Sequence, residues 1–443
     1  MTTLPRFPTK QSGRILALLF AILFVGVLDN QVILPILSLI ASVLRRSVTE
    51  MGWVITGYAF AAALQNLLFG PLSDYFGRKP ILLFGLGGFA LSAYVLSIAT
   101  AFSLFFALRT LMGVFAGILS TCVTAYVGDY FPYAVRGRAM GTVLASYFAA
   151  LVVGVPLGAV VADRWDWHWI FRATSLLASL LIVLAVLILP RLRVTTESPR
   201  NSSQRTTKDI QKAGPPGAPS AVRHKSPPES TLLPFEIIRE NVGEHFHRYR
   251  DYLSSQEKLA ALISAAFVSG ATLALLAFVS PWLVQVFGLS ESKVGMVFLL
   301  VGAASMLASP LSGWLSDLIG KRRLFLLSSF ATAFLVVFLP SARGLGWLLA
   351  LFFAVALAIA FRQTSQQTLV TELTPTRGRG SFVALRNCFS QVGIGVSVFL
   401  ASLLYAKYGF AAVVILSSLE SILAACCFFL VREPALASST VHE

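Results

Sequence analysis

The residues best suited to chemistry in this sequence are charged side chains inside long apolar runs: Asp29, Arg109, Arg172, Arg362, Arg386 and Glu420. A charge is costly in hydrocarbon, so such residues normally face a cavity or pair with one another. Asp29 and Arg109 lie at similar depths, within roughly 6 Å at 1.5 Å per residue, and we expect them to pair. Because burial favours a neutral carboxyl and a nearby guanidinium favours a carboxylate, moving Arg109 would change how tightly Asp29 holds a proton. The pair therefore predicts proton coupling, and a static structural pair is the alternative.

Other polar side chains in these runs could line a path for a solute. Arg362, Arg386 and Glu420 are expected to form a small buried cluster, with Glu420 as a second candidate proton carrier. Arg172 lies near the end of its run, where a long side chain can reach the interface, and we assign it no role. Apolar neighbours favour an amphipathic or lipophilic solute over a sugar. The predicted substrate-cavity residues are Asn30, Gln65, Asn66, Arg362, Gln363, Gln366, Gln367, Arg386, Asn387 and Gln391.

The elements that must position these residues are apolar runs long enough to cross a bilayer. Hydrophobic residues make up 56% of the 443 and charged residues only 12%, against roughly 25% charged in soluble chains. A spanning helix needs about 20 mostly apolar residues, whereas a membrane β-barrel would show short alternating segments. We predict an all-α membrane protein with twelve transmembrane helices. The runs cover about 15–40, 51–72, 81–99, 102–128, 139–162, 168–190, 259–284, 293–316, 323–340, 345–371, 380–404 and 409–431.

The placement of the basic residues predicts an orientation. Lys and Arg are concentrated on the segments that would be inside if the amino terminus were inside, which fits the positive-inside rule. We therefore expect a multi-pass protein of the cell's inner (plasma) membrane with both termini cytoplasmic. The first run is too long for the apolar part of a signal peptide. The positive-inside rule accounts for the net charge of +15 without a nucleic-acid partner. We expect a monomer in the lipid bilayer.

The chain divides into two halves around a polar segment. Residues 194–231 are rich in Ser, Thr, Pro, Lys and Arg and cannot bury enough apolar surface to fold alone. Apolar residues then recur at spacings of three and four over 235–253, which predicts an amphipathic helix at the membrane surface. The predicted domains are a six-helix bundle over 1–190, a cytoplasmic linker over 191–258 and a second six-helix bundle over 259–443.

The two halves repeat each other. "GPLSDYFGRKP" (70–80) returns as "GWLSDLIGKRR" (313–323), and at the same spacing Asp129 matches Glu372. Two loops per half at one spacing are hard to attribute to chance. Pseudo-symmetric bundles of six helices are a repeat architecture of secondary transporters.

These motifs resemble those of the major facilitator superfamily. "GPLSDYFGRKP" matches its signature loop between the second and third helices, "RTLMG" (109–113) resembles its fourth-helix motif, and "WHWIF" (167–171) resembles the element that opens its sixth helix. "LDNQVILPILSLIA" (28–41) resembles the first-helix motif of the drug/proton antiporter branch, although Gln31 replaces its Thr and Ser38 stands in place of a second Pro. The resemblance implies the twelve-helix fold and proton-coupled export.

The fifth-helix motif of that branch is only partly present. Gly154 and Gly158 fall on its positions, but Pro156 is one residue late. Physically, the two glycines form a face that lets helices approach closely. Pro156 removes a backbone donor and bends the helix. We predict that these three residues serve helix packing.

The signature loops are predicted to act as a cytoplasmic gate. Ion pairs at a wet interface contribute little free energy and break readily, as a reversible closure requires. We expect Asp74 to accept a hydrogen bond from a helix amino terminus of the other half, and Arg78 to reach Asp129. The alternative is that the basic residues are only topology signals. The predicted gate residues are Gly70, Asp74, Gly77, Arg78, Lys79, Asp129, Asp317, Lys321, Arg322 and Glu372.

The sequence contains no motif that would indicate an enzyme. No Walker-type phosphate loop occurs, and the five histidines and four cysteines show no metal-ligand spacing. We therefore predict no enzyme activity, no catalytic residue, no cofactor and no metal. The leading function is alternating-access, proton-coupled export of a small drug-like or metabolite solute. A facilitator or symporter that imports a small organic solute is one alternative, and a non-transporting sensor on the same fold is another.

Overall fold

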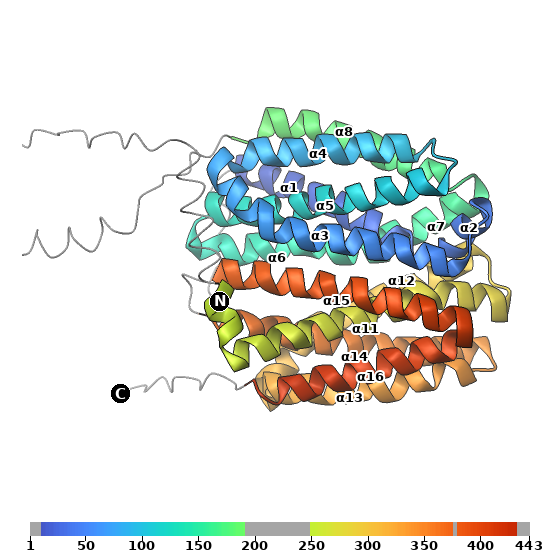
Figure 1. Cartoon of the computed structure of the whole chain (residues 1–443). Helices are drawn as coiled ribbons and strands as arrows, with labels where there is room; N and C mark the ends of the chain where they lie inside the picture. Colours follow the sequence, from blue (N-terminus) through green and yellow to red (C-terminus); the bar gives the residue numbers. More distant parts are fainter. Residues whose placement is uncertain (1–9, 191–248, 375–378, 432–443) are drawn as a thin grey trace, which may run out of the picture.

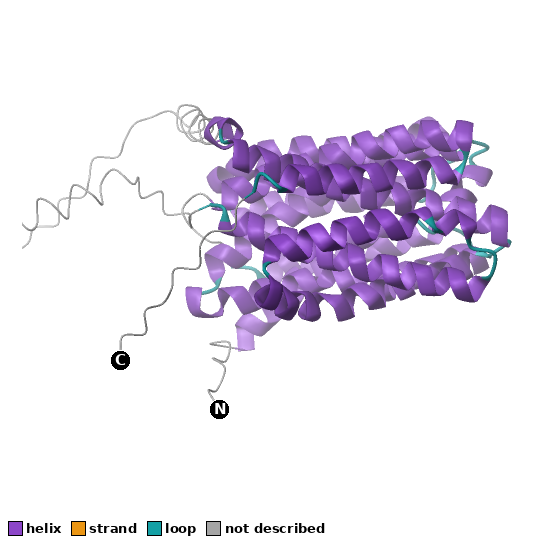
Figure 2. Cartoon of the chain, turned by 90° about the horizontal axis from the view of Figure 1, so that it is seen from below, coloured by secondary structure: helices purple, strands orange, loops and turns teal. Residues whose placement is uncertain are grey.

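The computed structural model describes residues 10–190, 249–374 and 379–431. Within these ranges it omits the side chains of residues 10, 69–75, 133–134, 309, 317, 371 and 379–380. These parts of the chain are helical, with no strand among the described residues (Figure 2). The linker, most of the predicted amphipathic segment and the side chains of Gly70, Asp74 and Asp317 lie outside the description. Of the segment 235–253, residues 249–253 are described and are helical.

The first half supplies six spanning stretches, drawn in blue to green in Figure 1. They are α1 (Lys10–Val32), α3 (Val48–Phe76), α4 (Arg78–Leu96), α5 (Phe102–Tyr130), a composite stretch and α8 (His168–Ile188). The composite stretch joins α6 (Tyr133–Ala149), a π-helical turn η1 (Ala150–Gly154) and α7 (Val155–Arg164). A short helix, α2 (Leu37–Val43), follows α1.

The second half supplies six more, drawn in yellow to red (Figure 1). They are α11 (Gln256–Phe287), α12 (Glu291–Ile319), α13 (Lys321–Val337), α14 (Leu345–Glu372), α15 (Arg379–Tyr408) and α16 (Phe410–Phe428), with a 3-10 turn η2 (Leu339–Ser341) after α13. We call the end of the bundle where α1 begins and α16 ends the terminal end, and the opposite end the far end.

Length and composition qualify eleven helices among the described residues to cross a membrane. The one predicted run that is not among these eleven is the second, 51–72, which forms the 29-residue helix α3. α3 carries Gln65 and Asn66 in its interior, and polar residues lower the hydropathy of a helix. It is also one of the two elements that contact the other half most extensively, packing along α15. The predicted all-α membrane fold is confirmed.

The first run differs from the prediction in one respect. The run 15–40 was expected to be one helix, but α1 ends at Val32 and α2 begins at Leu37. Pro35 lies in the break, where it can neither donate a backbone hydrogen bond nor continue the preceding turn. Its carbonyl accepts a 2.7 Å hydrogen bond from the buried Ser280 hydroxyl of α11. The break thus provides a contact between the two halves at the far end.

The fifth spanning stretch departs from regular α-helix just before Pro156. The π-helical turn η1 ends two residues before it, and local π adjustments are one way a membrane helix satisfies the backbone groups that a proline frees. Gly154 and Gly158 face α1, because a Cβ added there would meet the side chains of Leu28 and Val32 at 2.3 Å and 2.1 Å. The composite helix therefore packs closely on α1 through these glycines.

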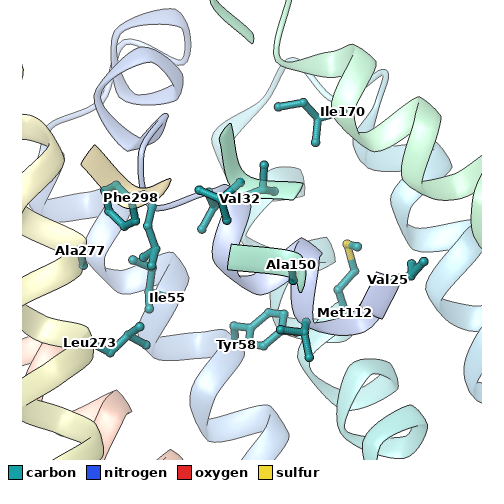
Figure 3. Packing of buried hydrophobic residues seen from close by; sticks show 14 of the residues in the cluster. Val25, Val32, Ile55, Tyr58, Met112, Ala150, Ile170, Leu273, Ala277 and Phe298 are labelled. Carbon is teal, nitrogen blue, oxygen red and sulfur yellow. The ribbon is translucent and has the colours of Figure 1, made fainter. Parts of the chain in front are cut away.

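The apolar core continues across the halves. Figure 3 shows Val32 and Ile55 of the first half in the same cluster as Leu273, Ala277 and Phe298 of the second. Hydroxyl groups add hydrogen bonds between the halves: Thr56 donates to the Gly395 carbonyl, Ser38 to Glu291, and Ser292 to Asp163. All the cross-half donors described here are neutral, so these contacts can form and break without separating charges.

Candidate functional site

The centre of the first half contains a buried ion pair. Nη1 of Arg109 in α5 donates to both carboxylate oxygens of Asp29 in α1, each at 2.8 Å. The two side chains are 1% and 0% exposed. A buried pair is strongly destabilised when one partner is removed, because the other charge is left without compensation. The contact expected between these residues is therefore present, whereas their role in proton coupling stays a prediction.

Close approach of α3 and α5 completes the surroundings of this pair. The guanidinium Cζ of Arg109 lies 4.9 Å from the ring centroid of Tyr58 in α3, a cation–π contact. One turn along α5, a Cβ on Gly113 would lie 2.4 Å from the Tyr58 carbonyl oxygen. Glycine at 113 thus allows the Tyr58 ring to cover Arg109. Sequence reasoning missed Tyr58, because nothing in its spacing distinguishes it from a core aromatic residue.

At the terminal end, the two signature loops make mirrored contacts. Arg78 Nε donates to Asp129 at 2.9 Å, and Lys321 Nζ donates to Glu372 at 2.6 Å. In each half, the base at the start of the third helix thus reaches the acid near the end of the fourth. These contacts are the ones expected from the repeat, and each lies within its own half.

The neighbouring basic residues Lys79 and Arg322 contact backbone carbonyls at helix ends. Lys79 donates to the carbonyls of Val186 and Leu189 at the end of α8, and Arg322 donates to the Phe429 carbonyl just after α16. The last carbonyls of a helix lack intrahelical partners, and a cation there also complements the helix dipole. Lys79 and Arg322 therefore hold the sixth helix of their own half. The contacts described for Lys79 and Lys321 lie within their own halves.

We predict that the Arg78–Asp129 contact matters more for transport than for stability. The Arg78 and Asp129 side chains are 13% and 42% exposed, so the ion pair itself should contribute less than about 1 kcal/mol to the free energy of unfolding, while Arg78→Ala should lower the rate of transport. The charge-reversed double variant Arg78→Asp/Asp129→Arg should recover part of that rate. Solute flux and thermal unfolding of the same preparations would check both effects.

Arg46→Ala is the matched control, since Arg46 forms an exposed pair with Glu50 near the far end. Equal transport by Arg78→Ala and the wild type would leave the loop as a topology signal only.

The predicted substrate-cavity residues separate into groups in the structure. Gln65 is buried in α3. Its side-chain amide donates to the Thr121 hydroxyl of α5 at 3.5 Å, and that hydroxyl donates to the side-chain oxygen Oδ1 of Asn66 at 3.5 Å. Arg386 and Asn387 of α15 contact each other at 3.2 Å. Half-buried Asn30 and Gln391 and exposed Gln363 and Gln367 complete the predicted set.

Arg362 and Glu420 occupy a separate place inside the second half. Arg362 is fully buried and donates to the hydroxyls of Ser421 at 2.7 Å and Thr272 at 2.8 Å. Glu420 accepts a hydrogen bond from Ser397. Each charge acts on the other electrostatically, but Arg386 is not among their described contacts. The expected three-residue cluster is therefore reduced to Arg362 and Glu420, and Gln366 binds Ser264 nearby.

The family model described as the Major Facilitator Superfamily matches residues 19–245 and 262–442. The chain belongs to the Major Facilitator Superfamily. The superfamily's transporters are not enzymes, in agreement with the sequence prediction.

Relatives within the superfamily include proteins named for drug resistance. The chain is 23% identical to the uncharacterised MFS-type transporter YceJ of Bacillus subtilis (strain 168) over 88% of each protein. It is 31% identical to Multidrug resistance protein 3 of the same organism, over 35% of this chain and 30% of that protein. The solved structure of a D-xylose–proton symporter superposes with a TM-score of 0.70, covering 96% of this chain and 99% of that one, at 16% identity, which shows the shared fold.

Proposed function

We propose that this transporter exports a small amphipathic solute in exchange for protons, by alternating access between the two six-helix halves. The observation that carries the proposal is the buried Asp29–Arg109 pair, because a facilitator needs no titrating group in the middle of its helices. Proton uptake by Asp29 would weaken its attraction to Arg109 and so change the contact between α1 and α5. The relatives named for multidrug and bicyclomycin resistance support the export direction.

The membrane arrangement is part of the same proposal. With both termini and residues 191–258 on the cytoplasmic side of the inner membrane, the far end faces outward. The cross-half hydrogen bonds of Ser280, Ser38 and Ser292 then join the halves at the outer end. A monomer supplies every element that this cycle needs.

The test is solute accumulation in membrane vesicles of known orientation. Everted vesicles containing the protein are energised and given a panel of fluorescent amphipathic solutes that includes cations, neutral molecules and anions. We expect accumulation that a protonophore abolishes. Accumulation only in right-side-out vesicles would favour the importer, and flux independent of the gradient would favour the facilitator. Absence of flux for every solute would favour the sensor.

A further inference from the structure

Arg386 is a cation that lies on the surface of α15 facing the other half. Its guanidinium lies near the Tyr147 side chain of α6. Its Nη1 donates to the side chain of the adjacent Asn387, while its buried Nε has no hydrogen-bond partner. At 1.5 Å per residue, Arg386 lies roughly 10 Å along α15 from its first residue. A guanidinium at that depth has few ways to meet its hydrogen-bonding needs.

The exposure of Tyr147 indicates an accessible space beside Arg386. Tyr147 lies well inside the composite fifth helix, and its side chain hydrogen-bonds to Ser120 of α5. The hydroxyl is thus directed inward between α5, α6 and α15, and not toward lipid. Yet Tyr147 is 42% exposed. An inward-directed side chain with this exposure borders an accessible space between the halves.

Arg386 differs from the other interior arginines in the groups that surround its charge. Arg109 is paired with Asp29, and Arg362 shares its surroundings with Glu420. Arg172 lies near the start of α8 over the Trp169 ring. No acidic side chain is among the contacts described for Arg386. Within the described part of the chain, the groups beside Arg386 are therefore a neutral amide and a neutral hydroxyl.

We propose that the transported solute is an organic anion and that Arg386 is the residue that recognises its charge. The inference rests on the proposed function, whose solute class it names. A guanidinium presents parallel N–H groups that match the two oxygens of a carboxylate, sulfonate or phosphate. Tyr147 and Asn387 flank it and can donate further hydrogen bonds. An anion would supply the negative charge that this part of the protein lacks.

The experiment compares anions with neutral analogues of the same shape. Purified full-length protein in detergent is given a panel of aromatic and aliphatic carboxylates, sulfonates and phosphate monoesters, each paired with its uncharged amide, sulfonamide or ester. Thermal stabilisation measures binding. In the wild type we expect at least one anion to bind tenfold or more tightly than its neutral partner. Arg386→Gln should remove that preference, and Arg386→Lys should retain part of it.

Two controls keep the outcome specific. Arg172→Gln removes an arginine from the far end and should leave the preference unchanged. The neutral partners should bind Arg386→Gln and the wild type equally, which shows that the variant is folded. A panel in which no anion binds better than its neutral analogue overturns the proposal, as does an anion preference that survives in Arg386→Gln. If neutral or cationic solutes still accumulate with a proton gradient, export stands and only the anion assignment fails.

Discussion

Asp29→Asn is expected to abolish uphill transport driven by a pH gradient, while downhill exchange of the solute partly survives. Asparagine keeps nearly the same volume and can still accept a hydrogen bond from Arg109, but it cannot take up a proton. Solute flux in proteoliposomes, with and without an imposed gradient, measures both quantities. Asp166→Asn, at an exposed acid between α7 and α8, is the matched control. We expect a loss of at least tenfold in gradient-driven flux for Asp29→Asn and none for Asp166→Asn.

A second variant separates coupling from a static role for the pair. Removing one charge of a buried pair costs on the order of 3–5 kcal/mol, whereas replacing both can be nearly neutral. The double variant Asp29→Asn/Arg109→Gln should therefore regain thermal stability. If the pair carries the proton, uphill flux stays absent in that stable double variant, whereas a structural pair would recover flux along with stability. If Asp29→Asn alone keeps the wild-type flux, another acid must carry the proton, and Glu420 is the next candidate.

Gly113→Ala is expected to destabilise the first half strongly, although it adds a single methyl group. The added carbon would lie 2.4 Å from the backbone oxygen of Tyr58, and a backbone atom cannot move aside as a flexible side chain can. Overpacking of this kind costs typically 1–3 kcal/mol. α3 and α5 should separate, and Tyr58 should lose its contact with Arg109. Thermal unfolding in detergent and the yield of monodisperse protein would measure the change.

Gly128→Ala provides the control in the same helix. No atom lies within 4 Å of a Cβ added there, and alanine favours helix by roughly 1 kcal/mol over glycine. Gly128→Ala should thus be neutral or slightly stabilising. Equal unfolding temperatures for the two variants would show that the close approach of α3 and α5 at Gly113 is not needed.

The spanning helices and the ion pairs that repeat between the two halves could be predicted from the sequence, because both depend on local residue patterns. Apolar length predicts each spanning helix, and the repeat predicts that Lys321 or Arg322 reaches Glu372 if Arg78 reaches Asp129; the structure shows Lys321 in this contact. The partners of Lys79 and Arg322 were missed because they are backbone carbonyls at helix ends, which no side-chain pattern marks.

The surroundings of each interior charge were harder to predict. Depth along a run suggested that Asp29 meets Arg109, but it equally suggested that Arg386 joins Arg362. Only the rotation of the helices about their axes decides that Arg362 faces Thr272 and Ser421 inside its own half while Arg386 faces Tyr147. Rotation depends on packing over the whole helix, so residue spacing within one run does not determine it.

The Asp29–Arg109 pair has an electrical consequence. As an ion pair it has no net charge, so the helices that carry it can shift within the membrane without doing work against the voltage. A proton on Asp29 would leave the positive charge of Arg109 uncompensated. One elementary charge that crosses the whole membrane potential corresponds to about 2.3 kcal/mol per 100 mV. Protonation of Asp29 would thus add one positive charge to the part of the carrier that responds to an inside-negative potential, so voltage, at equal pH on both sides, should favour movement of the proton-loaded carrier over that of the deprotonated one.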